Sequence, residues 1–369
     1  QLAAGRTNVR PEVAEAIAER LSAGPLPTVR MLGVTGMGDL APLADLVIGL
    51  IGDVDLAQGE ALPLIGQSSF VTAQAALAVH DMRVLLDCLA GVAALDVEAY
   101  AANPSPYDPA AGAVRPYPGY QWALARLSGL LAGSALYAEE PRHLQSPLSF
   151  RDAAPVLGAA HDALAFAEGQ VGIELNAHQQ NPLALPERDL MLPVANFDLQ
   201  AIATALDLVR LALAPCLTMQ VERSIKLLQA SETGLTTGLE PPGDLAGHGY
   251  SEMAWPLQGI GAEARLLPQP VSAEVGSATQ AEGIEDRMTM AHLAARRTRE
   301  MADLGFRVAA IGATFACQAI DLRGTERLGP ALAERHAAVR AIVPGLGAGD
   351  PPPDDLTPLI AALRAGLVA

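Results

Sequence analysis

The sequence has few aromatic residues, few cysteines and no clustered metal ligands. Only 4% of its 369 residues are Phe, Trp or Tyr, and its three cysteines, Cys88, Cys216 and Cys317, each lie among apolar neighbours. There is no C-x-x-C pair, and the seven histidines show no spacing such as H-E-x-x-H. These absences argue against a disulfide-stabilised secreted fold and against a metal site, and they favour reduced, buried thiols in a cytoplasmic protein.

Positive charge and long apolar runs are also scarce. The chain has 24 Lys and Arg against 41 Asp and Glu, a net charge of -17, so phosphate backbones and anionic membrane surfaces repel it. We therefore expect no nucleic-acid or membrane partner. The most apolar run, Leu46 to Ile51, is far shorter than the about 20 residues of a membrane span. The glycines at 33, 36 and 38 follow no strand and precede no Walker lysine, which excludes a phosphate loop.

Ala, Leu and Gly dominate what is present, and 50% of the chain is hydrophobic. This composition favours closely packed helices. Apolar residues recur three and four positions apart over several long segments, which predicts helices rather than strands. The expected helices begin at Pro11 and then cover 68–90, 121–136, 156–181, 197–229 with a kink at Pro215, and 284–322. Segments 101–120 and 344–355 are rich in Pro and Gly and are expected to be loops.

One nonapeptide, Thr35 to Leu43 (TGMGDLAPL), resembles the G-A-S-G-D-L-A-P-L signature of histidine, phenylalanine and tyrosine ammonia-lyases and the related aminomutases. Further segments resemble other motifs of that family in the same order. They are 62–68 (L-x-L-x-N-G-T), 115–119 (R-P-H-P-G), 145–151 (Q-D-x-Y-S-x-R), 174–182 (E-x-N…D-N-P), 196–197 (the N-F of G-N-F-H-G) and 284–290 (Q-E-D-H-V-S-M). The chain is therefore identified as a divergent member of this family along essentially its whole length.

The resemblance carries an expectation for the architecture. It implies an all-α fold, a long antiparallel helical bundle of the aromatic amino acid lyase type, as a single domain over residues 1–369. It also implies a homotetramer whose active sites combine several chains. Because Gln1 to Arg6 reads as the middle of a pattern, we expect a fragment that lacks the family's N-terminal segment.

The family's catalytic electrophile, a methylidene-imidazolone (MIO), forms when an Ala-Ser-Gly triplet cyclises and the serine loses its hydroxyl. The corresponding residues here are Gly36, Met37 and Gly38. Methionine has no β-hydroxyl to eliminate, so we expect no such cofactor. Other motif positions have also changed: Gly66 replaces an asparagine, Leu148 a tyrosine, Gln180 an aspartate and Asp198 a histidine.

Several motif positions are retained, and the resemblance implies roles for them. Glu285 matches a catalytic acid or base, and the expected substrate-binding residues are Arg151, Gln145, Phe197 and Asn181. A guanidinium such as that of Arg151 grips a carboxylate with two parallel hydrogen bonds, so a small carboxylate-bearing molecule is the expected ligand.

Each of these residues also has a structural explanation. Arg151 would pair with a structural carboxylate, Glu285 would complement the dipole of a helix that it opens, and Phe197 would be plain core. Asp39, directly before an apolar run, would cap a helix. The sequence leaves both explanations open.

Three functions follow from this pattern. The loss of the electrophile with retention of Arg151, Gln145 and Glu285 favours an MIO-lacking enzyme with re-purposed lyase, addition or cyclisation chemistry on an amino acid-derived substrate, as in specialised biosynthesis. The number of lost motif residues favours a non-catalytic ligand-binding or scaffold homologue. An ordinary histidine or aromatic amino acid ammonia-lyase is the third alternative.

Overall fold

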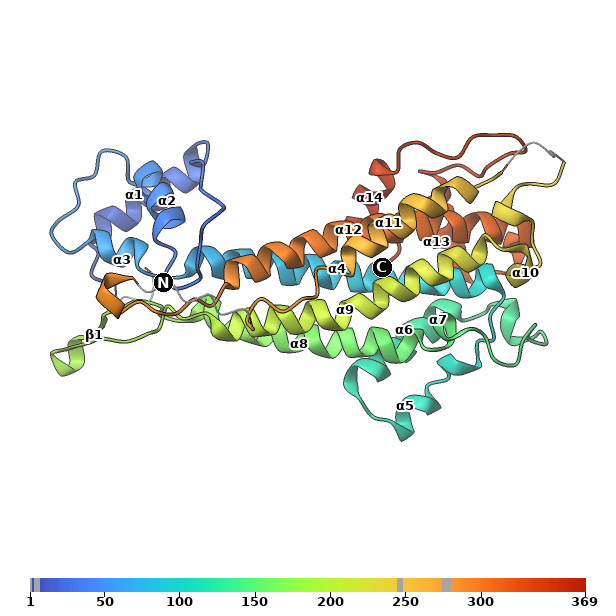
Figure 1. Ribbon diagram of the computed structural model, residues 1–369, viewed down its shortest axis with the longest axis horizontal. Helices are drawn as coiled ribbons and strands as arrows, with labels where there is room; N and C mark the ends of the chain where they lie inside the picture. The colour runs from blue at the N-terminus through green and yellow to red at the C-terminus, as the bar shows by residue number, and fades with distance from the viewer. Residues whose placement is uncertain (1, 3–6, 244–247, 274–279) are drawn as a thin grey trace. The chain divides into compact units, whose positions relative to one another are not determined.

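The computed structural model of the protein describes residues 2, 7–243, 248–273 and 280–369, and it is mostly helical (Figure 1). Four helices are long: α4 (Ser69–Tyr100), α8 (Ala153–Asn176), α9 (Gln200–Leu227) and α12 (Ala291–Arg323). The shorter α-helices are α1 (Pro11–Ala23), α2 (Leu40–Ile51), α3 (Ala61–Ile65), α5 (Ala110–Val114), α6 (Pro118–Leu131), α7 (Leu148–Arg151), α10 (Ala230–Thr233), α11 (Ala254–Ala264), α13 (Pro330–Arg340) and α14 (Thr357–Arg364). This content confirms the predicted helical fold class.

The chain forms two compact units, each assembled from three segments. Unit 1 consists of Gln1–Val79, Phe166–Leu208 and Pro270–Thr298, and unit 2 of His80–Ala165, Val209–Gln269 and Arg299–Ala369. The division falls within the four long helices, so each of them contributes residues to both units. In unit 1, α1 packs on α2 and α2 on α3 (Figure 1). The single domain expected over residues 1–369 stays a prediction. The segment Gln1 to Arg6, from which we expected a missing N-terminal part, lies mostly outside the described residues.

Helix α4 is the central helix of unit 2. Its residues 88–100 are buried on every face, as in a helix surrounded by other elements. We predicted that this helix ends near Ala90, which was wrong by ten residues. Gly91 does not end it, because the glycine is needed for packing: a Cβ there would lie 2.0 Å from the carbonyl oxygen of Val368.

Some of the other predicted helix boundaries agree with the structure and others do not. The helix starting at Pro11 is confirmed, and α9 continues through Pro215. The helix expected from Ile284 begins only at Ala291. The absence of strands was wrong, because β1 (Leu183–Leu185) and β2 (Leu190–Leu192) form an antiparallel hairpin. Strands of three residues are too short to produce a visible alternation.

Helix α9 also corrects the prediction that no segment has the length and composition of a membrane span. By those two criteria it does, and it is the only such helix among the described residues. An 18-residue window of α9 is 56% buried inside the protein, and the helix carries the buried Asp207 and Arg210. Both observations are typical of a core helix.

Unit 2 buries two acidic residues of α4. The Asp96 carboxylate accepts hydrogen bonds from Arg223 Nε and Gln220 Nε2, both at 2.8 Å. Burial nevertheless outweighs these partners and raises the pKa of Asp96 to about 6. Glu98 is buried beside Ser134, and burial likewise raises its pKa to about 7. Its Oε1 has no hydrogen-bond partner among the residues that the structure describes.

Glu98 makes stability depend on pH. Between its ordinary pKa of 4.5 and about 7, the folded state holds a proton that the unfolded state has released, so the free energy of unfolding falls as pH rises through this window. Replacing Glu98 by Gln removes this titration. We expect the decrease between pH 5 and pH 8, measured by urea unfolding, to become smaller by roughly 1–3 kcal/mol in Glu98→Gln.

The control is Glu334→Gln, at an exposed position of α13. It should leave the pH dependence of the wild-type protein unchanged. An equally steep decrease in Glu98→Gln would show that Glu98 ionises in the folded protein as it does in water.

Candidate active site

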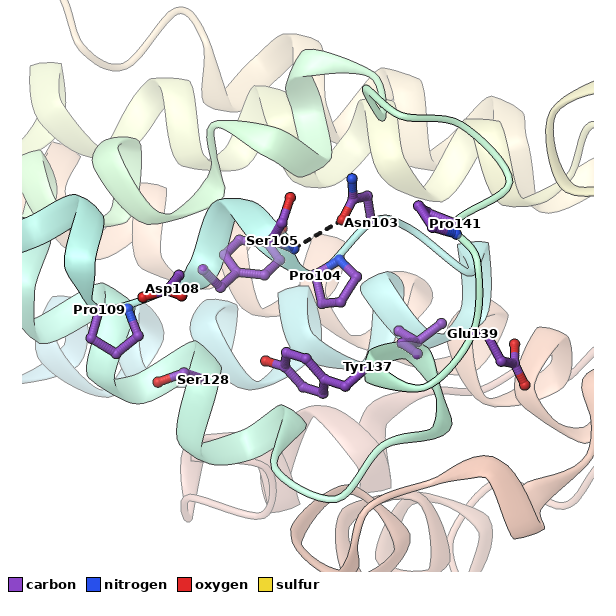
Figure 2. A pocket seen from close by; sticks show the side chains of 11 residues that line it. Asn103, Pro104, Ser105, Asp108, Pro109, Ser128, Tyr137, Glu139 and Pro141 are labelled. Atoms are coloured by element: carbon purple, nitrogen blue, oxygen red, sulfur yellow. Dashed lines mark hydrogen bonds between the residues drawn. The ribbon is translucent and has the colours of Figure 1, made fainter.

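Unit 2 contains a cavity of about 360 Å³ between the 103–109 segment and the 128–141 segment (Figure 2). Its lining includes the carboxylates Asp108 and Glu139 and the phenol of Tyr137, and it has no Lys, Arg or His among the residues described. Much of its polar lining is already paired. Asn103 Oδ1 accepts from Ser105 N at 3.0 Å, the bond drawn in Figure 2, and Glu139 receives two bonds from Arg327. The cavity is therefore poorly suited to an anionic ligand.

Unit 1 contains a larger cavity, of about 610 Å³, which we call the unit 1 pocket. Three segments, 33–42, 195–198 and 280–288, supply most of its lining. The described lining residues are Gly33, Val34, Thr35, Met37, Gly38, Leu40, Ala41, Pro42, Leu62, Gly66, Asn181, Ala195, Phe197, Asp198, Gln280, Ile284, Glu285, Asp286, Arg287 and Met288. The pocket thus brings together five predicted site residues, namely Met37, Gly38, Asn181, Phe197 and Glu285.

Hydrogen bonds hold the three segments in place. Met37 and Asp198 form an isolated antiparallel bridge. Ser68 Oγ donates to Phe197 O at 2.6 Å and accepts from Gly38 N at 3.3 Å. Thr289 Oγ1 donates to Gly36 O at 2.7 Å. Sequence analysis did not identify the roles of Ser68 and Thr289, because serine and threonine hydroxyls give no signal until their acceptors are known.

Asp39 connects the same glycine-rich loop to helix α4. It precedes α2, but its side chain makes no cap bond to that helix. Instead, its Oδ2 accepts from Val71 N at 2.8 Å, in the first turn of α4. The predicted cap therefore serves a different helix. Burial outweighs this bond and raises the pKa of Asp39 to about 7.

Glu285 lies on the pocket lining but not at the start of a helix. Helix α12 begins six residues later, at Ala291, so complementing its dipole does not explain Glu285. The side chain is exposed, and Gln280 pairs with its backbone. A carboxylate in this position is accessible to a ligand in the pocket.

Asn181 and Phe197 line the pocket from two different loops. Asn181 Oδ1 accepts from Val194 N at 2.9 Å, a bond that spans the β1–β2 hairpin. Phe197 is half-buried and is therefore not plain core. The neighbouring Gln180, where the family pattern has aspartate, donates its side-chain amide to Pro63 O at 2.7 Å. An ionised aspartate has no donor and could not make that bond.

Arg151 and Gln145 belong to unit 2. Arg151 is the last residue of α7, and its side chain is 33% exposed. Its Nε lies 4.0 Å from Asp152 Oδ1, a contact too long for a hydrogen bond. Gln145 is exposed. Their roles in binding a carboxylate stay predictions.

The residues at the triplet do not fit the family's prosthetic group. Met37 carries no hydroxyl that dehydration could remove. Gly36 has φ of +77°, and a Cβ there would lie 2.3 Å from Thr289 Oγ1 and 2.9 Å from Ala291 N, so the backbone does not accept alanine. Among the residues that the structure describes, no three His, Cys, Asp or Glu side chains could hold a metal ion.

Gly36→Ala tests the fit at this position. Gly33 provides a matched control, because it has a similar φ of +80° but no atom of the described residues within 4 Å of the position that a Cβ would take. Both substitutions incur the left-handed backbone cost of about 1–2 kcal/mol, and only Gly36→Ala also displaces Thr289. We expect Gly36→Ala to lower the free energy of unfolding by at least about 1 kcal/mol more than Gly33→Ala, measured by chemical denaturation. Equal losses would mean that the 289–291 segment moves freely.

Comparison with known proteins identifies the family of this chain and supports an enzyme of the lyase kind. The family model for aromatic amino acid lyases matches residues 1–55 and 53–341, so the chain belongs to the aromatic amino acid lyase family. It is 32% identical to histidine ammonia-lyase of Deinococcus radiodurans, over 94% of this chain and 70% of that protein. It is 30% identical to the enzyme of Sorangium cellulosum, over 99% and 77%.

Solved structures agree with this assignment. Histidine ammonia-lyase from Trypanosoma cruzi superposes with a TM-score of 0.89 at 25% identity, over 99% of this chain and 73% of that one. Tyrosine aminomutase from Streptomyces globisporus superposes with a TM-score of 0.90 at 26% identity, over 100% and 77%. These matches confirm the predicted family and the predicted helical fold.

The relatives correct the predicted function. We expected re-purposed addition or cyclisation chemistry, or a non-catalytic homologue, and this was wrong. The similarity to histidine ammonia-lyases runs through more than nine-tenths of the chain, and it supports the third alternative, an ordinary ammonia-lyase.

Proposed function

We propose that this protein is an amino acid ammonia-lyase that removes ammonia from L-histidine or an α-amino acid of similar size. The observation that carries the proposal is the unit 1 pocket, which gathers Glu285, Asn181 and Phe197 in one cavity of about 610 Å³. That volume is within the range of about 300–1,000 Å³ typical of small-molecule sites. The identity to histidine ammonia-lyases supports the choice of reaction.

In this proposal Glu285 is the base. Its exposed carboxylate takes a proton from the β-carbon of the substrate, the electron pair forms the Cα–Cβ double bond, and the C–N bond breaks to release ammonia. Phe197 packs against the substrate side chain, and the Asn181 amide offers a donor to it. Met37 takes no part in this proposed reaction.

We further propose that the chain forms no methylidene-imidazolone. The absence of a hydroxyl at Met37 and the lack of space for a Cβ at Gly36 support this proposal. We also propose that the protein is cytoplasmic and forms a homotetramer. Its ligand in this proposal is a small carboxylate-bearing molecule, and it has no nucleic-acid or membrane partner. The three buried, free cysteines and the net charge of -17 are consistent with it.

Glu285→Gln tests the base. A glutamine cannot accept the proton, so we expect kcat for ammonia release to fall by about 10²–10⁴-fold with little change in KM. Ammonia is measured enzymatically with L-histidine, L-phenylalanine and L-tyrosine as substrates.

The matched control is Glu282→Gln, three residues earlier in the same segment and outside the pocket lining. It should retain wild-type turnover. If the wild-type protein releases no ammonia from any of the three amino acids, the proposed reaction is wrong. If Glu285→Gln is as active as Glu282→Gln, another group is the base.

Intact-mass spectrometry tests the prosthetic group. We expect the denatured chain to have the mass of its unmodified sequence, because residues 36–38 have no serine to dehydrate. A mass lower by two waters would contradict this expectation. The same measurement under native conditions reports whether four chains assemble.

A further inference from the structure

Gln180 is a buried side chain that borders the lining of the unit 1 pocket. It directly precedes Asn181, which lines the pocket, and it is only 3% exposed. Its Nε2 donates to Pro63 O at 2.7 Å, across 117 positions of the sequence. Pro63 belongs to α3, and the nearby Leu62 and Gly66 line the pocket. The bond therefore joins two parts of the pocket lining that are distant in the sequence.

Helix α3 is itself joined to the glycine-rich loop. Gln67 lies two residues after the end of α3, and its backbone oxygen accepts a hydrogen bond from Asp39 N at 2.7 Å. Asp39 follows Gly38, which lines the pocket. Through α3, Gln180 thus connects Asn181 with the loop on the other side of this helix in the hydrogen-bond network.

The amide of Asn181 is held at one of its two ends. Its Oδ1 accepts from Val194 N at 2.9 Å. The other end, Nδ2, is the donor that the proposed function assigns to the substrate. Two contacts set the direction of this donor: the bond at Oδ1, and the bond of Gln180, which fixes the backbone one residue earlier.

The bond to Pro63 depends on a residue in which this chain departs from the family pattern. The D-N-P motif has aspartate at position 180, and an ionised aspartate has no donor for a carbonyl oxygen. Gly66 departs as well, because it replaces an asparagine. Asn181 and Gln280 are therefore the side-chain amides among the described residues that line the pocket.

We propose that Gln180 is a positioning residue, and that its hydrogen bond to Pro63 holds the Asn181 amide in the orientation that binds the substrate. This inference rests on the proposed function for the role of Asn181. Gln180 is outside the described pocket lining and acts through its neighbour. A group that is oriented before the ligand arrives loses little conformational freedom on binding, so loss of the bond weakens binding.

The first test is calorimetric binding of L-histidine to Gln180→Met. Methionine is close to glutamine in shape but has no hydrogen-bond donor. We expect the Kd to rise about three- to tenfold. In an Asn181→Ala background the same substitution should leave the Kd unchanged, because no amide remains to be positioned. A merely structural role would weaken binding equally in both backgrounds.

The second test needs no ligand. The Val194 amide is bonded to Asn181 Oδ1, so its hydrogen–deuterium exchange reports how firmly the Asn181 side chain is held. We expect exchange in the peptide that contains Val194, measured by mass spectrometry, to be about three- to tenfold faster in Gln180→Met.

The matched control is Gln318→Met in unit 2. Gln318 is 2% exposed, and its Nε2 also donates to a backbone carbonyl, Leu346 O at 3.2 Å. This variant loses the same kind of bond but should keep the wild-type Kd and Val194 exchange. Thermal unfolding checks that each variant is folded. If Gln180→Met is not folded, Gln180→Glu at pH 9 replaces it, because an ionised glutamate keeps the shape and donates nothing.

The outcomes distinguish the inference from the proposed function. A wild-type Kd in Gln180→Met overturns the inference, and so does an equal rise in the Asn181→Ala background. If the wild-type protein binds no L-histidine, the proposed function is wrong and the exchange of Val194 decides: unchanged exchange in Gln180→Met overturns the positioning of Asn181, and faster exchange supports it. Binding that depends on Gln180 in a protein that releases no ammonia supports the inference and contradicts the proposed reaction.

Discussion

The hydrogen bonds that Ser68 and Thr289 make to the glycine-rich loop are the interaction on which the unit 1 pocket depends. Ser68 joins the loop to Phe197, and Thr289 joins it to the segment that carries Glu285 and Arg287. These bonds bring together three loops that are distant in sequence, and the three loops line one pocket. The hydrogen bond between Thr289 and the backbone of Gly36 holds the two segments close together. Position 36 therefore has no space for a side chain.

The pocket illustrates how a site changes in a retained scaffold. The relatives place the chain in the aromatic amino acid lyase family over nearly its whole length, while residues at the pocket differ from the family patterns. Two of these differences are coupled to each other, because the charges of Asp198 and Arg287 form an ion pair. Another, Gln180, forms a bond to Pro63 that an ionised aspartate could not form. Fold and site therefore have to be argued separately.

Much of the fold could be predicted from the sequence. Periodicity and composition together located all four long helices, and the Pro11 start was correct, because these features are local. The errors occurred where a distant contact overrides a local signal. Gly91 stays helical because the carbonyl of Val368 packs against it, and the segment before Ala291 stays non-helical while it pairs with Gln280 and the glycine-rich loop.

By itself, the sequence determined the family, the helical fold class and the covalent chemistry available at Met37, since each follows from residue identity and order. It also located Glu285, Asn181 and Phe197 through motif resemblance. Only the tertiary structure decided that these three share a cavity, that Asp39 caps α4 and that Arg287 is held by Asp198 and Gln200. A hydrogen bond depends on the distance between two atoms, and for residues about 90 positions apart that distance is set by how the chain folds.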